Sequence, residues 1–274
     1  MSEPWWSRLG TVICLVAAIG LLGAIGLVVG GSETGTDDER RRQVGLRPRT
    51  LVDSIYALAT PVVDALAARG VRPNHVTATA LGLAGLTGLA LAADAIAVGA
   101  VLLVVTGGCD LLDGHLARKL DRQSPAGAFF DSFADRIAEA FIFGGLAYAG
   151  AGAALTWLAV WALVASLAIS YARARGEGLG VDGAVGLMQR PERFGLLIVT
   201  LGIAALVDIW PAPEAAQFAD RVVAGGIGLL AVLATGTAIR RARTIFTELR
   251  TDDLSTADPE TSSRSLDPGA DSES

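Results

Sequence analysis

Four aspartates at helical spacing stand close together in the sequence, and their carboxylates could bind a divalent metal ion. Asp110 and Asp113 are three residues apart, while Asp131 and Asp135 are four apart, so each pair lies on one face of a helix. Clustered carboxylates repel one another and are costly at membrane depth unless a cation binds them. Mg²⁺, Mn²⁺ and Ca²⁺ prefer such oxygen ligands. The spacing therefore predicts a hard metal site formed by two helix faces.

The elements that must position these aspartates are long apolar helices. The chain is 52% hydrophobic, and a run of about 20 apolar residues can cross a bilayer as a helix. Seven such runs are present, at residues 11–30, 76–93, 96–108, 137–152, 153–169, 194–210 and 222–238. We expect the third helix to continue through Asp110 and the fourth to begin within residues 127–135. The sequence predicts an all-α integral membrane protein with a six-transmembrane-helix core and one extra N-terminal transmembrane helix.

The distribution of basic residues predicts the orientation in the membrane. Arginine and lysine gather after the first, third, fifth and last apolar runs, within residues 40–49, 118–122, 173–193 and 240–250. The loops at residues 93–97 and 149–155 contain neither. Because positive charge favours the cytoplasmic side, the N-terminus is expected outside and the aspartates in the cytoplasm. We expect a multi-pass protein of the plasma membrane.

Composition divides the chain into four segments. These are an N-terminal transmembrane anchor, a charged linker, a membrane domain and an acidic disordered tail, at residues 1–31, 32–49, 50–250 and 251–274. Residues 51–68 have apolar side chains at intervals of three and four, which predicts a juxtamembrane amphipathic helix on the cytoplasmic surface. A soluble packing helix is the alternative. Pro61 is expected to kink or divide this helix.

The aspartate stretch resembles the signature of the CDP-alcohol phosphatidyltransferase family, Asp-x2-Asp-Gly-x2-Ala-Arg-x8-Gly-x3-Asp-x3-Asp. Every fixed position is present, namely Asp110, Asp113, Gly114, Ala117, Arg118, Gly127, Asp131 and Asp135. The alternative, a solvated helix face, is disfavoured between apolar segments. The resemblance implies a six-helix membrane core, and an enzyme that transfers a phosphatidyl-type group from a CDP-linked lipid to an alcohol with release of CMP.

The resemblance also implies roles for these residues. Asp110, Asp113 and Asp131 would bind Mg²⁺ or Mn²⁺, and two such ions suit a pyrophosphate donor. Asp135 would ligate one ion or remove the proton of the acceptor, so the catalytic assignment falls on Asp131 and Asp135. The CDP-lipid would be bound by the remaining signature positions and by a Pro-Asn-x-hydrophobic-Thr segment, which adds Gly114, Ala117, Arg118, Gly127, Asn74 and Thr77. Arg118 could instead serve only as a positive-inside anchor.

A basic cluster follows the fifth apolar run and could bind a phosphorylated acceptor, because guanidinium groups pair with phosphate oxygens in a bidentate manner. Its members are Arg173, Arg175, Arg190 and Arg193. The segment is similar to the inositol-phosphate branch of the family, although Arg173 stands where that branch often has lysine and Gln189 where it often has glutamate. Inositol phosphate is the favoured acceptor and glycerol phosphate the runner-up. Simple control of topology is the alternative role.

The competing class of protein is a non-enzymatic cation carrier that uses the same aspartates. Ion transport gives no reason for the glycine, alanine and arginine positions of the signature. No nucleic-acid motif is present, so the expected partners are the bilayer, a CDP-lipid and a small phosphorylated polyol. A homodimer is expected by analogy with the family. Lys119 is the only lysine, and this arginine-rich composition is compatible with an archaeon, where the donor would be CDP-archaeol and not CDP-diacylglycerol.

Overall fold

The computed structural model describes residues 49–149, 152–182 and 185–257, and side chains within residues 59–251. This part of the chain forms helices and no strands. The helices are α2 (Arg49–Ala68), α3 (Pro73–Ala92), α4 (Ile96–Lys119), α5 (Pro125–Tyr148), α6 (Ala153–Glu177), α7 (Arg190–Asp208) and α8 (Ala215–Ala257). The all-α prediction is confirmed. The expected N-terminal transmembrane helix, the linker at 32–48 and most of the tail lie outside the described residues.

Proline opens two of the helices near the aspartates, and a serine caps one of them. Pro73 opens α3 and Pro125 opens α5, positions at which a missing N–H costs no helical hydrogen bond. The Ser124 hydroxyl caps α5 by accepting a hydrogen bond from the Gly127 N–H at 3.1 Å. The helix therefore starts just before the 127–135 interval that we predicted. As expected, α4 continues through Asp110 to Lys119.

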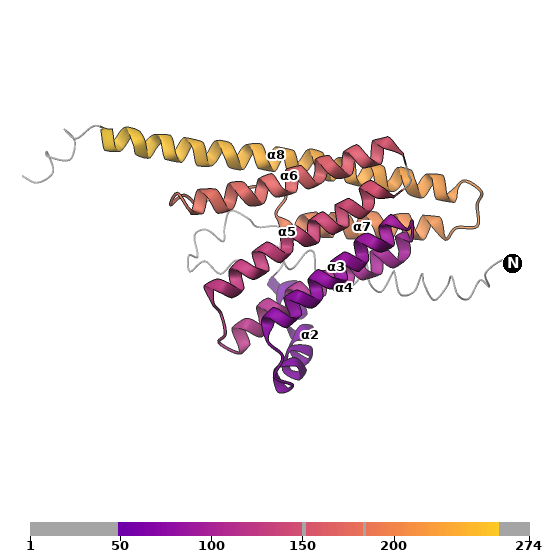
Figure 1. Cartoon of the computed structure of the whole chain (residues 1–274), viewed down its shortest axis with the longest axis horizontal. Helices are drawn as coiled ribbons and strands as arrows, with labels where there is room; N and C mark the ends of the chain where they lie inside the picture. The colour runs from indigo at the N-terminus through magenta and orange to yellow at the C-terminus, as the bar shows by residue number, and fades with distance from the viewer. Residues whose placement is uncertain (1–48, 150–151, 183–184, 258–274) are drawn as a thin grey trace, which may run out of the picture.

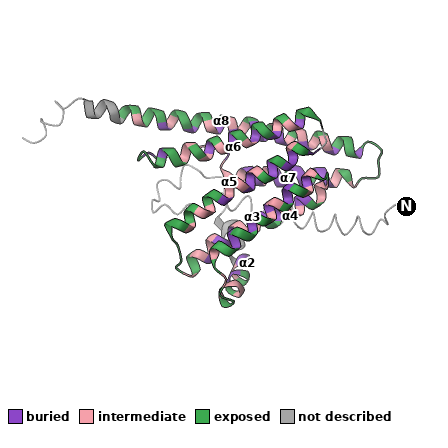
Figure 2. Cartoon of the chain, in the orientation of Figure 1, coloured by how far each residue is buried: buried purple, intermediate pink, exposed green. Residues whose placement is uncertain are grey.

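The helices pack so that α3 holds the two aspartate-bearing helices. Figure 1 shows α6 and α8 side by side along one side of the molecule, with α3 and α4 on the other and α5 between. Both α4 and α5 pack against α3, and α7 packs against α4 and α8. Leucine and isoleucine side chains from several helices fill the centre, where burial is greatest (Figure 2). Among them are Leu103, Ile142, Leu201 and Leu230.

Four of the described helices are long and apolar enough to cross a membrane: α3, α4, α6 and the Ala215–Thr251 part of α8. The helices α5 and α7 are not among these four, and they carry Asp131, Asp135, Arg190 and Arg193 of the expected site. This composition supports an integral membrane protein. Each of the six predicted runs of the core overlaps one of the helices α3 to α8, and the number of spans stays a prediction.

Two helices, α2 and α8, differ from the sequence-based expectation. Pro61 lies inside α2 and does not divide it, so division of the helix at that residue is ruled out, while a kink there stays a prediction. The Val63 side chain of this helix is fully buried against Val76 and Leu116, and this packing stabilises the segment after the proline. At the other end, α8 continues to Ala257, into the segment that we assigned to the tail.

The helices α3 and α5 approach each other closely at two glycines. A Cβ added at Gly88 would lie 2.3 Å from the Phe141 carbonyl oxygen, and one at Gly145 would lie 2.2 Å from the Gly88 carbonyl oxygen. Small residues of this kind let helix backbones meet in a membrane. The contact fixes α5, and hence Asp131 and Asp135, relative to α3.

The glycine contact predicts a difference between two neighbouring alanine substitutions. Gly145→Ala is expected to lower the free energy of unfolding by about 1–3 kcal/mol, because the methyl group has only backbone to displace. Gly144→Ala is the control, since nothing lies within 4 Å of a Cβ at that position. Unfolding of both variants in detergent would be compared by the loss of helical circular dichroism. Equal stability of the two variants would contradict the close approach.

Candidate active site

Three of the four signature aspartates form one cluster. Asp110 and Asp113 of α4 and Asp131 of α5 each offer a carboxylate oxygen, and these oxygens lie within 4.8 Å of one another. The Thr77 hydroxyl of α3 donates a hydrogen bond to Asp113 at 2.7 Å. Because α3 packs against both other helices, it brings the two halves of the signature together. The predicted convergence of two helix faces is confirmed for these three residues.

The cluster fits a hard divalent metal ion by its donor chemistry. All three ligating groups are carboxylates, the donors that Mg²⁺ and Mn²⁺ prefer. The Oδ1 atom of Asp131 is buried and has no hydrogen-bond partner. A buried carboxylate oxygen without a partner is costly, and a metal ion would satisfy it.

The fourth aspartate joins the cluster through Arg190, the first residue of α7. One guanidinium nitrogen of Arg190 forms an ion pair with Asp110, and the other lies 2.8 Å from Asp135. The guanidinium carbon stands 4.9 Å from the centre of the Phe194 ring, within range of a cation–π interaction. Arg136 approaches the second oxygen of Asp135 at 3.8 Å. The structure thus unites one predicted acceptor residue with the predicted metal ligands.

A second ion pair lies one helical turn deeper. The Arg193 guanidinium is 2.6 Å from Glu139 of α5, and the side chains are only 2% and 4% exposed. Arg193 also donates a hydrogen bond to the Met188 carbonyl at 3.1 Å. Sequence reasoning missed Glu139, although it continues the four-residue series of Asp131 and Asp135 and this periodicity could have indicated it.

The other two predicted acceptor arginines lie near the end of α6. Arg173 forms an ion pair with Glu177 one turn further along at 2.8 Å. Arg175 is exposed. Three of the four predicted acceptor residues therefore form ion pairs: Arg190 with the aspartates, Arg193 with Glu139 and Arg173 with Glu177.

The loop that precedes Arg190 is anchored by α8. Arg241 is 2% exposed and donates hydrogen bonds to the carbonyls of Ile169 and Val185, both at 3.0 Å. The Met188 N–H donates to the Thr237 hydroxyl at 3.2 Å. Gly186 has a φ of +127° and packs so closely on Thr237 that a Cβ would lie 2.4 Å from its methyl group. Sequence reasoning assigned Arg241 only to topology, and no local pattern distinguishes it from neighbouring arginines.

The predicted CDP-lipid residues surround the aspartates on three helices. A Cβ at Gly127 would lie 3.6 Å from the Asn74 side-chain oxygen, so the start of α3 and the start of α5 are adjacent. At Gly114 the nearest atom to an added Cβ is a guanidinium nitrogen of Arg118, at 3.6 Å. Arg118 is exposed and Ala117 is half-buried. At both glycines, therefore, neighbouring polar side chains approach the helix backbone.

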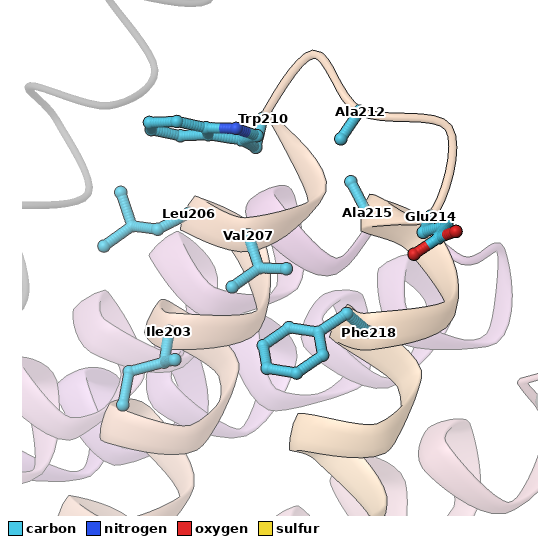
Figure 3. Close-up of a pocket in the computed structure, with 8 residues that line it drawn as sticks. All are labelled: Ile203, Leu206, Val207, Trp210, Ala212, Glu214, Ala215 and Phe218. Carbon is cyan, nitrogen blue, oxygen red and sulfur yellow. The ribbon is translucent and has the colours of Figure 1, made fainter.

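An apolar pocket of about 480 Å³ lies between the end of α7 and the start of α8 (Figure 3). Because a helix rises 1.5 Å per residue, the pocket begins roughly 20 Å along α7 from Arg190. It is therefore remote from the carboxylates. Its lining residues are Ile203, Leu206, Val207, Trp210, Ala212, Glu214, Ala215 and Phe218.

Apolar helices that converge on a carboxylate site define an integral membrane protein with a candidate metal centre. The family model for CDP-alcohol phosphatidyltransferase matches residues 71–237, which include every residue of the signature. The chain belongs to the CDP-alcohol phosphatidyltransferase family.

Two curated relatives are similar over the same region. The chain is 40% identical over 155 residues to phosphatidylinositol phosphate synthase of Streptomyces avermitilis, covering 54% of this chain and 63% of that protein. The chain thus spans less than two thirds of the length of this relative. It is 34% identical over 149 residues to archaetidylinositol phosphate synthase of Methanothermobacter thermautotrophicus, covering 54% of this chain and 75% of that protein.

The fold resembles crystal structures of phosphatidylinositol phosphate synthase from Mycobacterium tuberculosis. The structure with CDP-DAG bound has a TM-score of 0.59 and 28% identity, and the match covers 70% of this chain and 94% of that one. The same enzyme in complex with manganese and citrate has a TM-score of 0.59 and 28% identity, with 69% and 89% covered. That mycobacterial enzyme thus holds a CDP-lipid in one structure and manganese in the other.

Proposed function

We propose that the protein transfers a phosphatidyl or archaetidyl group from a CDP-lipid to a phosphorylated polyol and releases CMP. The favoured acceptor is inositol phosphate. The observation that carries the proposal is the contact of Arg190 with Asp110 and Asp135, because a guanidinium group beside a carboxylate cluster supports binding of a phosphate there. The names of the bacterial and archaeal relatives support the same acceptor.

The reaction forms and breaks one bond to phosphorus. A hydroxyl oxygen of the acceptor attacks the phosphorus attached to the lipid, and the bond from that phosphorus to the bridging oxygen of CMP breaks. Asp110, Asp113, Asp131 and Asp135 would hold one or two Mg²⁺ or Mn²⁺ ions. Bound ions of this kind supply positive charge to the pyrophosphate.

The protein's own residues would orient the two substrates. Thr77 fixes one carboxylate oxygen of Asp113 by its 2.7 Å hydrogen bond, leaving the other for a ligand. Asp135 is the proposed acceptor of the hydroxyl proton, while Arg190 beside it would bind the phosphate of the polyol. The donor nucleotide would lie against Asn74 and the small signature residues, which are Gly114, Ala117 and Gly127. Arg118 would contact its phosphates.

The setting of the reaction follows from the charge distribution. The basic residues near the aspartates support an active site that faces the cytoplasm, in the plasma membrane, with the N-terminus outside. We also propose a homodimer, which rests on analogy with the family. Both CDP-diacylglycerol and CDP-archaeol are proposed donors, because bacterial and archaeal relatives are similarly close.

The test is release of CMP by the purified protein with a CDP-lipid and Mg²⁺ or Mn²⁺. Inositol phosphate, glycerol phosphate, serine and free inositol are compared as acceptors. Release with inositol phosphate alone is the expected result. Release with glycerol phosphate would keep the reaction and change the acceptor. If folded, metal-binding protein released no CMP with any acceptor, a cation carrier would replace the proposed enzyme.

A further inference from the structure

Two ion pairs join α5 to α7 in successive helical turns. Arg190 contacts Asp135, and three residues later on α7 Arg193 contacts Glu139, four residues later on α5. The helices that pack closely against α7 are α4 and α8. The contact between α7 and α5 is therefore made by the long side chains of Arg190 and Arg193. The relative position of α5 and α7 along their axes is thus tied to the two arginines.

The Glu139–Arg193 pair is expected to stabilise the fold less than its close geometry would suggest. Arg193 and Glu139 are 2% and 3% exposed, so both charges lose their hydration. Within the part of the chain that the structure describes, the Oε2 atom of Glu139 and the Nε atom of Arg193 are buried without hydrogen-bond partners. A buried pair that leaves such atoms unsatisfied contributes less than apolar side chains of similar size. Stability alone therefore does not account for this pair, whereas a directional contact that fixes helix position does.

We propose that the Glu139–Arg193 pair is a positioning element, which sets α7 against α5 so that Arg190 reaches both Asp110 and Asp135. Neither Glu139 nor Arg193 touches the aspartate cluster. Arg193 was predicted to bind the acceptor phosphate directly, and its burial and pairing support this indirect role instead. The expected effect on acceptor binding rests on the proposed function, whereas the effect on the position of Arg190 beside Asp110 and Asp135 does not.

The test replaces both charges by apolar residues of comparable length. Glu139→Leu combined with Arg193→Met keeps the interior filled and leaves no charge unpaired. We expect a melting temperature close to that of the parent. The KM for the acceptor should rise at least about tenfold, with the KM for the CDP-lipid changed by less than about twofold, because a small misplacement of a binding group is costly. An unchanged acceptor KM in a folded variant would overturn the proposal.

A double-mutant cycle separates positioning from an independent effect. In an Arg190→Gln background the paired replacement should have no further effect on the acceptor KM, because the side chain that it positions is already absent. An additional tenfold rise in that background would show that the pair acts by another route. If the paired variant did not fold, Arg193→Lys would be used, since it keeps the charge and loses the planar fork. It should give a smaller change in the same direction, and no change would overturn the proposal.

Binding of Mn²⁺ without substrates gives a readout that needs no turnover. Arg190 neutralises Asp110 and Asp135, so it competes with a metal ion for these carboxylates. The paired replacement and Arg190→Gln should each tighten Mn²⁺ binding, and the combination should not exceed Arg190→Gln alone. If the parent released no CMP, the proposed function would fail while this measurement still tested the positioning role. Unchanged Mn²⁺ affinity in the folded paired variant would overturn it.

Discussion

Asp131→Asn is expected to lower the rate of CMP release by about a thousandfold or more. The substitution removes the negative charge of a carboxylate whose buried Oδ1 has no hydrogen-bond partner among the described residues. Charge stabilisation by a bound metal ion contributes several kcal/mol to such reactions, and each 1.36 kcal/mol is a factor of ten. The measurement is the initial rate at saturating Mn²⁺ and acceptor, together with Mn²⁺ affinity by titration.

The matched control for this variant is Asp94→Asn. Asp94 is exposed in the turn between α3 and α4 and has a φ of +61°, a conformation that asparagine also tolerates. We expect CMP release by this variant within about twofold of the parent, because exposed substitutions away from functional features have small effects. If Asp131→Asn kept the turnover and the Mn²⁺ affinity of the parent, the carboxylate cluster would have no part in the mechanism.

Arg190→Gln is expected to raise the KM for inositol phosphate by about 10- to 100-fold. Hydrogen bonds to charged groups contribute about 1.5–3 kcal/mol, and glutamine cannot form the bidentate pair with phosphate. Arg190→Lys should recover only part of the loss, because an ammonium group lacks the planar fork. Steady-state kinetics with the acceptor varied at saturating CDP-lipid measures the effect.

The control for Arg190 must change the same charge at a distant site. Arg250→Gln does so on the exposed face of α8, and we expect its acceptor KM to match that of the parent. A substrate comparison adds specificity: any residual turnover with free inositol should be much less affected by Arg190→Gln than turnover with inositol phosphate. Equal losses with both acceptors would contradict phosphate binding by Arg190.

Much of the aspartate cluster could be predicted from the sequence, because its residues recur at helical spacing. The intervals within each aspartate pair placed the carboxylates on helix faces, and the apolar runs placed those helices in one bundle. Three of the aspartates do converge, and Thr77 does contact Asp113. The residues that share a helix face can be read from the sequence, because they depend only on the geometry of a single helix.

Contacts between helices distant in sequence could not be predicted in the same way. The spacing of the four predicted acceptor arginines does not reveal that Arg190 meets Asp110 and Asp135 while Arg193 meets Glu139. Which partner each selects depends on how far α7 is displaced along α5. Pro61 shows that local preference also fails to predict where a helix ends. Proline disfavours the helix interior, but α2 continues past it because Val63 packs into a buried cluster.

The hydrogen bonds from Arg241 have a consequence for the order in which the site is completed during synthesis. A nascent chain contains the aspartate-bearing helices well before its C-terminal helix leaves the ribosome. The carbonyls of Ile169 and Val185 gain this anchor only when Arg241 has been made and inserted. The segment that leads into Arg190 is therefore the last part of the candidate site to be secured, and a chain truncated within α8 before Arg241 would retain the carboxylates while lacking this anchor.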